Sequence, residues 1–331
     1  MPRRLVIAAR IVIAAEGAHV PLDYNRAMPE GLILRVDAKI AHVQVGDQVL
    51  QLPLRGRLFD GASSEKRPLA VGDRVALTVE ADHLGSAIDA VLPRQSRLSR
   101  RSAGEDGREQ VIAANVTHVL IVTALREPTF EAALVDRILA AAERESLPAT
   151  LVLTKVDRDK RGDAEQWTTL YRGLGYDVHV TSVTPGHETT ASLEALRDLL
   201  HRNLTVLCGP SGAGKSTLIN KLVPGVQLRT GAVGKIQQGK HTTTHTQLVP
   251  LPGGGHVLDT PGIRNFGLFG VNTQEIAFYF RDIKAHAGKC GYSNCSHRRE
   301  PDCAVRAAVD PSRLRSYEML LAEVEREGRE R

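Results

Sequence analysis

The sequence predicts a doubly wound α/β domain with a mostly parallel sheet, preceded by a five-stranded β-barrel and followed by a short helical region with a cysteine cluster. Three observations support this order. Residues 31–98 form short segments in which polar and apolar residues alternate, with Gly-Asp turns between them. Residues 111–272 alternate apolar runs with amphipathic segments. Beyond residue 273, three cysteines and a histidine lie within 14 residues.

The composition is that of a soluble globular protein with an anionic partner. A chain of 331 residues is long enough for two or three domains. The net charge of +5 favours nucleic acid as a partner, although only 4% of residues are aromatic, which argues against extensive base stacking. The clustered cysteines favour a metal site in a reducing cytoplasm over a disulfide framework. Arg10 interrupts the apolar run near the N-terminus, so we expect no membrane contact.

The N-terminal third is predicted to be a barrel. Residues 1–30 form an extension whose fold the sequence does not predict. Five segments have the alternation of half-buried strands, at residues 32–37, 41–45, 48–54, 74–80 and 86–93. They suit a small barrel of the oligonucleotide-binding type, which either contacts RNA or only packs against its neighbour. Residues 99–110 are polar and contain glycine, which predicts a linker. Three basic residues within or just before this segment either lie on phosphates or are solvated: Arg97, Arg100 and Arg101.

The region from residue 111 to residue 272 is predicted to be the doubly wound domain. Residues 116–124 are an almost continuous apolar run, as expected for a central parallel strand that is buried on both faces. An amphipathic helix follows at residues 130–145, and strands and helices then alternate. Such sheets bind ligands at the carboxyl ends of their strands.

One of these strands leads into a phosphate-binding loop. Residues 209–217, GPSGAGKST, match the pattern G-x-x-x-x-G-K-[ST] between a predicted strand and a predicted helix. Its glycines let backbone N–H groups converge on phosphates, Lys215 reaches the β and γ oxygens, and the Ser216 hydroxyl is a ligand for magnesium. The predicted nucleotide contacts are Gly209, Pro210, Ser211, Gly212, Ala213, Gly214, Lys215, Ser216 and Thr217.

A second motif, TKVD, ends an earlier strand and selects the base. Asp157 can accept hydrogen bonds from the N1–H and the 2-amino group of guanine together, whereas adenine lacks this pair of donors. Lys155 can lie along the base plane, and Thr154 can link this loop to the phosphate loop. After the next strand, the segment TSV can close over the guanine O6 through a backbone N–H. The predicted base contacts are Thr154, Lys155, Val156, Asp157, Thr181, Ser182 and Val183.

Two further loops are expected to complete a magnesium site. In the segment DTPG, Asp259 would hold magnesium through a water, and the Gly262 N–H would sense the γ-phosphate. The segment GKHTTTHT offers a threonine to the same ion, and we favour Thr243, with Thr242 as the alternative. The base reader therefore precedes the phosphate loop. This order predicts a circularly permuted guanine-nucleotide domain, because all these loops lie at one edge of the sheet.

The C-terminal cysteines are predicted to hold a structural zinc ion. The ligand set is Cys290, Cys295, His297 and Cys303, with the spacing C-x4-C-x-H-x5-C. Three thiolates and one imidazole complete a tetrahedron and leave no open position for catalysis. Helices are predicted at residues 273–287 and 312–331. Basic neighbours of the cluster could contact a phosphate backbone: Lys289, Arg298 and Arg299. Cys208 is separate and is predicted to be a packing residue.

Together these motifs resemble the circularly permuted GTPases of the ribosome small-subunit-dependent GTPase A family. The resemblance covers nearly the whole chain: a barrel, then TKVD, GPSGAGKST, GKHTTT and DTPG in this order, and a terminal cysteine cluster. Thr154 stands where asparagine is more usual, and its hydroxyl can serve the same bridging role. The resemblance implies GTP hydrolysis that the small ribosomal subunit stimulates, with the barrel and the zinc domain on ribosomal RNA.

In many GTPases, a glutamine directly after the DTPG-type motif orients the attacking water. In this sequence that position holds Ile263, which cannot orient water. His241, beside the switch threonines, is the best local candidate, because imidazole can accept a proton near neutral pH. His245 is a weaker candidate, and the alternative is that His241 is only a solvated loop residue. A site of this kind predicts slow intrinsic turnover that a partner activates.

We therefore expect a cytoplasmic, monomeric GTPase that hydrolyses GTP to GDP and phosphate with magnesium and acts in late maturation of the small ribosomal subunit. The alternative is an RNA-binding assembly protein whose nucleotide site has little turnover. A nucleotide kinase would need a second, phosphate-accepting domain after the loop, and the sequence contains no segment that suggests one.

Overall fold

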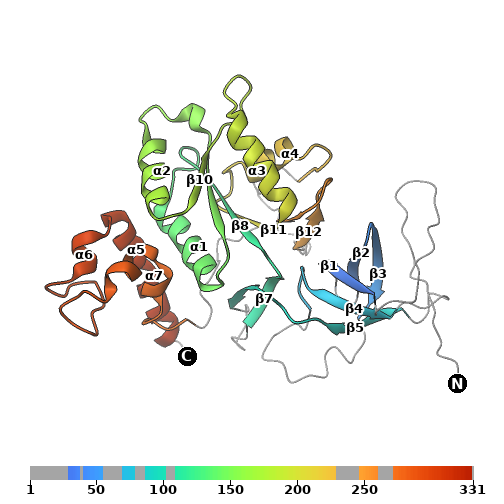
Figure 1. The fold of residues 1–331 in the computed structure, drawn as a ribbon, viewed down its shortest axis with the longest axis horizontal. Helices are drawn as coiled ribbons and strands as arrows, with labels where there is room; N and C mark the ends of the chain where they lie inside the picture. Colours follow the sequence, from blue (N-terminus) through green and yellow to red (C-terminus); the bar gives the residue numbers. More distant parts are fainter. Residues whose placement is uncertain are drawn as a thin grey trace, which may run out of the picture. The chain divides into compact units, whose positions relative to one another are not determined.

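The computed structural model describes residues 29–37, 40–54, 69–78, 86–101, 109–228, 246–259 and 271–329. The chain divides into two compact units, one around the N-terminal strands and the other around a parallel sheet and the C-terminal helices (Figure 1). Within the described ranges, no helix has the length and apolar character needed to cross a membrane.

The N-terminal strands form the five-stranded antiparallel sheet that the sequence predicted. They are β1 (Glu30–Val36), β2 (Ile40–Val45), β3 (Gln48–Pro53), β4 (Arg74–Thr78) and β5 (Ala87–Val91). The sheet order is β3-β2-β1-β4-β5, and β3 also approaches β5, as in a small barrel. Alternate residues point into one core, which includes Ile33, Val43, Leu52, Val75 and Leu77.

The prediction of a linker at residues 99–110 was wrong at both ends of this segment, which belong to strands. β6 (Arg97–Arg101) and β7 (Glu109–Ala114) pair in an antiparallel ladder there. Leu98 and Ala113 lie opposite each other and are both buried. The polar residues around Leu98 hide the alternation on which the strand prediction depends. Residues 102–108, which join the two strands, lie outside the described residues.

The second sheet has six strands in the order β10-β9-β8-β11-β13-β12. They are β8 (His118–Ala124), β9 (Ala149–Thr154), β10 (Asp177–Val180), β11 (Leu204–Cys208), β12 (Gln247–Pro250) and β13 (His256–Asp259). The four strands β8 to β11 are parallel, and every residue of β8 is buried. Their carboxyl ends therefore meet at one edge, as the doubly wound prediction requires.

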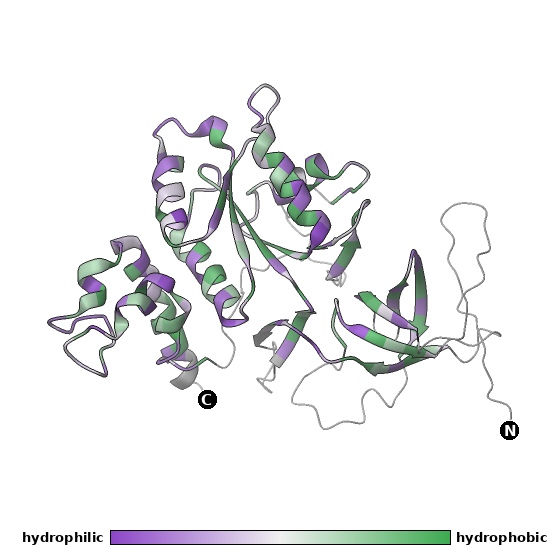
Figure 2. Cartoon of the chain, viewed as in Figure 1, coloured by the Kyte–Doolittle hydropathy of each residue, from purple (hydrophilic) through white to green (hydrophobic). Residues whose placement is uncertain are grey.

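Amphipathic helices cover this sheet. They are α1 (Ala132–Arg144), α2 (Asp163–Gly173), α3 (Thr190–Arg202) and α4 (Lys215–Leu222), and a short 3₁₀ turn, η2 (Val156–Arg158), follows β9. Figure 2 shows apolar and polar residues on different sides of α1 and α3. The buried side of α1 carries Ile138 and Leu139, together with one acidic residue, Asp136.

The C-terminal helical segments pack on α1 and on one another. They are η3 (Ile276–Tyr279), α5 (Arg281–Ala287), α6 (Ala304–Ala308) and α7 (Pro311–Arg329), and α7 lies beside α1 (Figure 1). The sequence predicted one continuous helix over residues 273–287, but the chain is extended at Phe280, with φ −112° and ψ 109°. This break lets the Phe280 ring become buried and pack edge-on against Tyr317, at 5.7 Å between ring centroids.

A buried ion-pair network attaches α7 to the sheet domain. The Arg313 guanidinium donates to Asp136 on α1. It also donates to both carboxylate oxygens of Asp282 on α5, with each of these two bonds at 3.0 Å. The Tyr171 hydroxyl on α2 donates to the same Asp136 carboxylate at 2.8 Å. Arg313 and Asp136 are each only 1% exposed, so both charges depend on this pairing.

Candidate functional site

The phosphate loop is pressed against the neighbouring strand β8. Gly209 has φ +128°, and a Cβ at this position would lie 1.9 Å from the carbonyl oxygen of Val122, so only glycine fits. Gly212 and Gly214 also have positive φ values, of 79° and 90°. α4 begins at Lys215, directly after this loop, and the start of a helix is where backbone N–H groups can bind an anion.

Lys215 is held inside the curve of this loop. Its ammonium donates to the carbonyl oxygens of Pro210 at 2.8 Å and of Gly209 at 3.0 Å. Ser216 follows in the first turn of α4 and is half-buried. Cys208 is fully buried in β11, and burial raises the pKa of its thiol to about 12, as expected for a packing residue.

The TKVD motif lies at the end of β9, beside the phosphate loop. The Thr154 hydroxyl is 2.6 Å from the carbonyl oxygen of Ala213 in the phosphate loop and 3.2 Å from that of Thr123 in β8. The link expected from the sequence between the two loops is therefore present. Lys155 follows in a left-handed conformation, with φ +57°, which turns the chain sharply before Val156 and Asp157.

Two hydroxyl groups hold the exposed carboxylate of Asp157. Ser182 donates to Oδ1 at 2.6 Å, and Thr184 donates to Oδ2 at 3.3 Å. The hydrogen bond from Ser182 is the main reason why the pKa of Asp157 is lowered. Ser182 is buried after β10, where the Thr181 N–H continues the ladder by donating to the Leu153 carbonyl at 2.8 Å.

Sequence analysis did not identify two residues that contact this site. One is Thr184, which directly follows the predicted TSV segment. The other is Glu127, whose carbonyl oxygen accepts from Lys155 and whose carboxylate pairs with Arg158. Glu127 comes shortly after the carboxyl end of β8, at the sheet edge where ligands bind, and this position is the signal that could have identified it.

Several predicted residues lie outside the described residues. They are His241, Thr243 and Gly262, with the alternatives Thr242 and His245 and the neighbouring Ile263. Asp259 is the last residue of β13, which lies next to β11 in the sheet. The strand therefore ends on the sheet beside the one that leads into the phosphate loop.

The predicted metal ligands are brought together near α6. The ligand atoms of Cys290, Cys295, His297 and Cys303 all lie within 4.8 Å of one another. The Nδ1 atom of His297 is 3.5 Å from the sulfur atoms of Cys290 and Cys303, and these sulfurs are 3.9 Å apart. Ligands of tetrahedral zinc, with bonds of about 2.0–2.3 Å, stand about 3.3–3.8 Å apart. The cluster therefore fits a metal ion of this kind.

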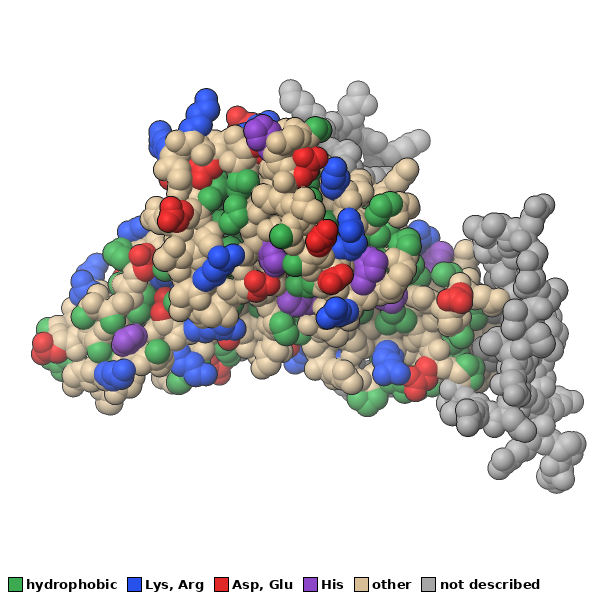
Figure 3. Space-filling view, turned by 45° about the horizontal axis from the view of Figure 1, so that its top comes forward, with side chains coloured by type: hydrophobic (Ala, Val, Ile, Leu, Met, Phe, Trp, Pro, Cys, Tyr) green, Lys and Arg blue, Asp and Glu red, His purple; other side chains and the backbone are tan. Residues whose placement is uncertain are grey.

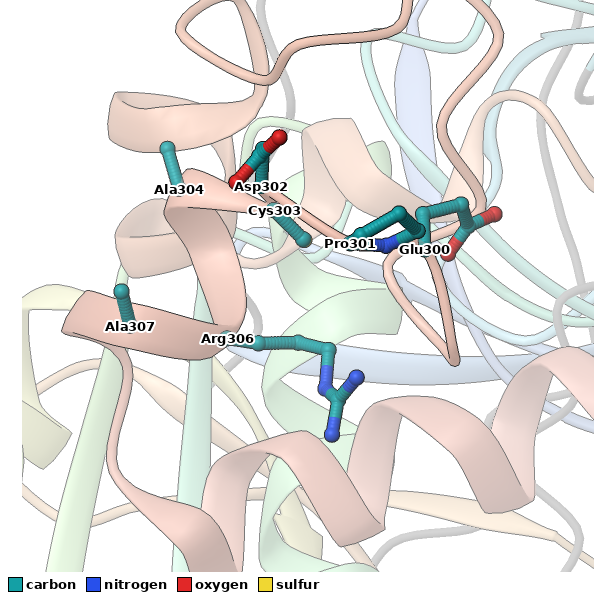
Figure 4. A pocket seen from close by; sticks show the side chains of 7 residues that line it. All are labelled: Glu300, Pro301, Asp302, Cys303, Ala304, Arg306 and Ala307. Carbon is teal, nitrogen blue, oxygen red and sulfur yellow. The ribbon is translucent and has the colours of Figure 1, made fainter.

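Hydrogen bonds shape the turn between these ligands. The Glu300 carboxylate accepts from the Ser296 hydroxyl at 2.6 Å and N–H at 2.7 Å and from the N–H groups of Arg298 and Arg299 at 3.0 and 3.1 Å. These bonds, led by the one from the Ser296 hydroxyl, lower the pKa of Glu300 to about 2. An open hollow beside the cluster is lined by Glu300, Asp302 and Arg306 among others (Figure 4).

The basic neighbours of the cluster differ in their surroundings. Arg298 donates to both carboxylate oxygens of Glu325 on α7, at 2.9 and 3.0 Å, so it ties the cluster to that helix. Lys289 and Arg299 are exposed. On the face of the described residues shown in Figure 3, basic and acidic side chains are interspersed and do not form a patch of one sign.

This fold and site define a nucleotide-binding protein of the phosphate-loop class, in which the base-reading loop precedes the phosphate loop. The model of the RsgA GTPase family matches residues 91–269. The chain is 39% identical over 305 residues to "Small ribosomal subunit biogenesis GTPase RsgA" from Chlorobaculum parvum, which covers 88% of this chain and 96% of that relative.

Solved structures show the same likeness. YjeQ from Thermotoga maritima matches with a TM-score of 0.70 and 28% identity, over 89% of this chain and 98% of that one. YloQ, described as a circularly permuted GTPase, matches with a TM-score of 0.69 and 26% identity, over 93% of this chain and 99% of that one. The chain therefore belongs to the RsgA GTPase family and is a circularly permuted GTPase.

Proposed function

We propose that this chain hydrolyses GTP to GDP and phosphate in late maturation of the small ribosomal subunit, and that the subunit activates it. The process follows from the names of its curated relatives, which are small ribosomal subunit biogenesis GTPases. The observation that carries the proposal for the site is the hydrogen bond from the Thr154 hydroxyl to the Ala213 carbonyl. It fixes the base-reading loop against the phosphate loop, so that one guanine nucleotide can span both.

The proposed roles follow from the chemistry of each loop. Asp157 accepts the N1–H and 2-amino groups of guanine, and Lys155 covers the base plane. The N–H groups of the phosphate loop and the Lys215 ammonium bind the β- and γ-phosphates. The remaining contacts of the base and the phosphates are Thr154, Val156, Thr181, Ser182, Val183, Gly209, Pro210, Ser211, Gly212, Ala213, Gly214, Ser216, Thr217 and Gly262.

We assign magnesium to Ser216, Thr243 and Asp259, and the orientation of the attacking water to His241. Magnesium would neutralise charge that develops on the phosphate oxygens. His241 is offered because imidazole near neutral pH can accept a proton from water.

The metal of the cysteine cluster is proposed to be zinc, because three thiolates and an imidazole, with ligand atoms within 4.8 Å of one another, are the ligand set of a closed zinc site. The barrel and the exposed Lys289 and Arg299 are proposed to contact ribosomal RNA. The protein is proposed to act as a monomer in the cytoplasm.

The base assignment is tested by the substitution Asp157→Asn. The amide can donate to the xanthine O2 but cannot accept both donors of guanine. We expect GDP binding to weaken by about 1.5–3 kcal/mol and xanthosine diphosphate binding to improve, as measured by calorimetric titration. Asp159→Asn is the matched control, since Asp159 accepts from the N–H groups of Asp163 and Ala164 at the start of α2. Unchanged GDP affinity in Asp157→Asn would remove this residue from the base pocket.

The metal assignment is tested by zinc content. The purified chain should hold one zinc ion, and Cys295→Ser should lower that ratio, because a hydroxyl replaces a thiolate ligand. Cys208→Ala, far from the cluster in sequence and buried in β11, is the control and should keep the full zinc content. A full zinc content in Cys295→Ser would show that the ligand set is wrong.

A further inference from the structure

The carboxylate of Asp157 is held at both oxygens by residues of the loop after β10. A closed set of three hydrogen bonds links the two loops: the Thr184 N–H donates to the Ser182 hydroxyl oxygen at 3.1 Å, Ser182 donates to Oδ1 at 2.6 Å, and Thr184 donates to Oδ2 at 3.3 Å. Ser182 is buried, so its bond reaches the carboxylate from inside the protein, whereas Thr184 and Asp157 are both exposed.

Two bonds constrain a carboxylate in a way that one bond does not. The terminal torsion of aspartate has a broad, two-fold energy profile, so a single hydroxyl on one oxygen still lets the carboxylate plane turn. A second hydroxyl on the other oxygen fixes that plane. Each oxygen has two lone-pair sites, so accepting one hydroxyl does not by itself fill an oxygen.

Guanine offers its N1–H and 2-amino donors side by side in one plane, and a carboxylate can accept both only when its own plane matches. We propose that Thr184 is a positioning residue for guanine recognition, which holds Asp157 Oδ2 so that both carboxylate oxygens meet the base. The inference rests on the proposed role of Asp157 as the base reader.

The test removes the Thr184 hydroxyl by substitution and, separately, removes the 2-amino donor of the base by a change of nucleotide. The full chain with Thr184→Val is titrated with GDP and with inosine diphosphate, which lacks the 2-amino group. We expect GDP affinity to fall about three- to tenfold and inosine diphosphate affinity to change less than about twofold, because only the two-donor base needs both oxygens fixed. Thr184→Ser restores the hydroxyl and should restore the ratio of the two affinities.

Thr189→Val is the matched control. Thr189 also donates from the same loop, but to the Thr181 hydroxyl at 2.8 Å and not to Asp157. It should leave the ratio of GDP to inosine diphosphate affinity unchanged. Equal loss for both nucleotides in Thr184→Val, or no loss for either, would overturn the proposal for Thr184. If Asp157→Asn itself leaves GDP binding unchanged, the base pocket is wrong, which is a separate outcome.

Discussion

Asp136 and Asp157 lie in the same domain, and hydroxyl groups hold both side chains, yet their surroundings differ. Asp136 is buried on α1, accepts from the Tyr171 hydroxyl and pairs with the buried Arg313 guanidinium. Asp157 is exposed at the end of β9 and accepts from Ser182 and Thr184. Burial raises the pKa of Asp136 against the opposing effect of Arg313, whereas hydrogen bonding, chiefly from Ser182, lowers that of Asp157.

The difference separates a structural carboxylate from one that is available to a ligand. A buried charge must be compensated by another charge, and this requirement fixes how α7 and α5 pack on α1. An exposed carboxylate that is oriented by neutral hydroxyls keeps free acceptor sites and its negative charge. The same side chain therefore serves as an anchor in one place and as a recognition group in the other.

The largest effect is expected from Arg313→Met. This substitution leaves Asp136 buried without its cation, so the free energy of unfolding should fall by about 3–5 kcal/mol. Urea denaturation measures the change. Arg315→Met on the exposed side of α7 is the control and should stay within about 0.5 kcal/mol of the parent. A loss of that small size in Arg313→Met would mean that the buried pair does not anchor α7.

A smaller effect is expected from Tyr171→Phe. The ring stays in place, but Asp136 loses one donor, so the free energy of unfolding should fall by about 0.5–1.5 kcal/mol. Thermal and urea unfolding measure this, and the half-exposed Tyr292→Phe is the control. A loss as large as that of Arg313→Met would show that the hydroxyl, and not the cation, is the main partner of Asp136.

The smallest effect concerns the titration of Asp157. Because its folded-state pKa is lowered, the stabilisation it contributes is fully present above its ordinary value of 3.8 and is lost as the pH falls through the lower, folded-state value. Carbon NMR of the Asp157 carboxyl should show a midpoint below 3.8 that rises toward this value in Ser182→Ala. An unchanged midpoint would mean that Ser182 does not hold the charge.

The backbone turn of the phosphate loop was predictable from the sequence because its geometry is set locally. The phosphate loop needs glycines, a lysine and a serine at fixed spacing, and Gly209 has the positive φ and close contact that such a loop requires. The strands β8 and β9 were equally predictable, since burial on both faces requires a continuous apolar run.

Other features depend on partners that are distant in sequence. Phe280 breaks a helical pattern because its ring is buried against α7. In the sequence, Arg313 resembles an ordinary surface charge, because its partners Asp136 and Asp282 are distant along the chain. The strand β6 is hidden because its buried apolar residue, Leu98, stands among polar residues. These misses share one cause: tertiary packing overrides a local pattern.

The place of Arg313 in the chain has a consequence for synthesis. Arg313 is separated from Asp136 by 177 positions, so α1 leaves the ribosome long before the cation that its buried carboxylate requires. Folding from the N-terminus can build the barrel and begin the parallel sheet, but this part of the core closes only when the last helix emerges. A chain that stops before Pro311 would keep every nucleotide motif, but it would lack Arg313, the cation that compensates the buried Asp136 carboxylate on α1.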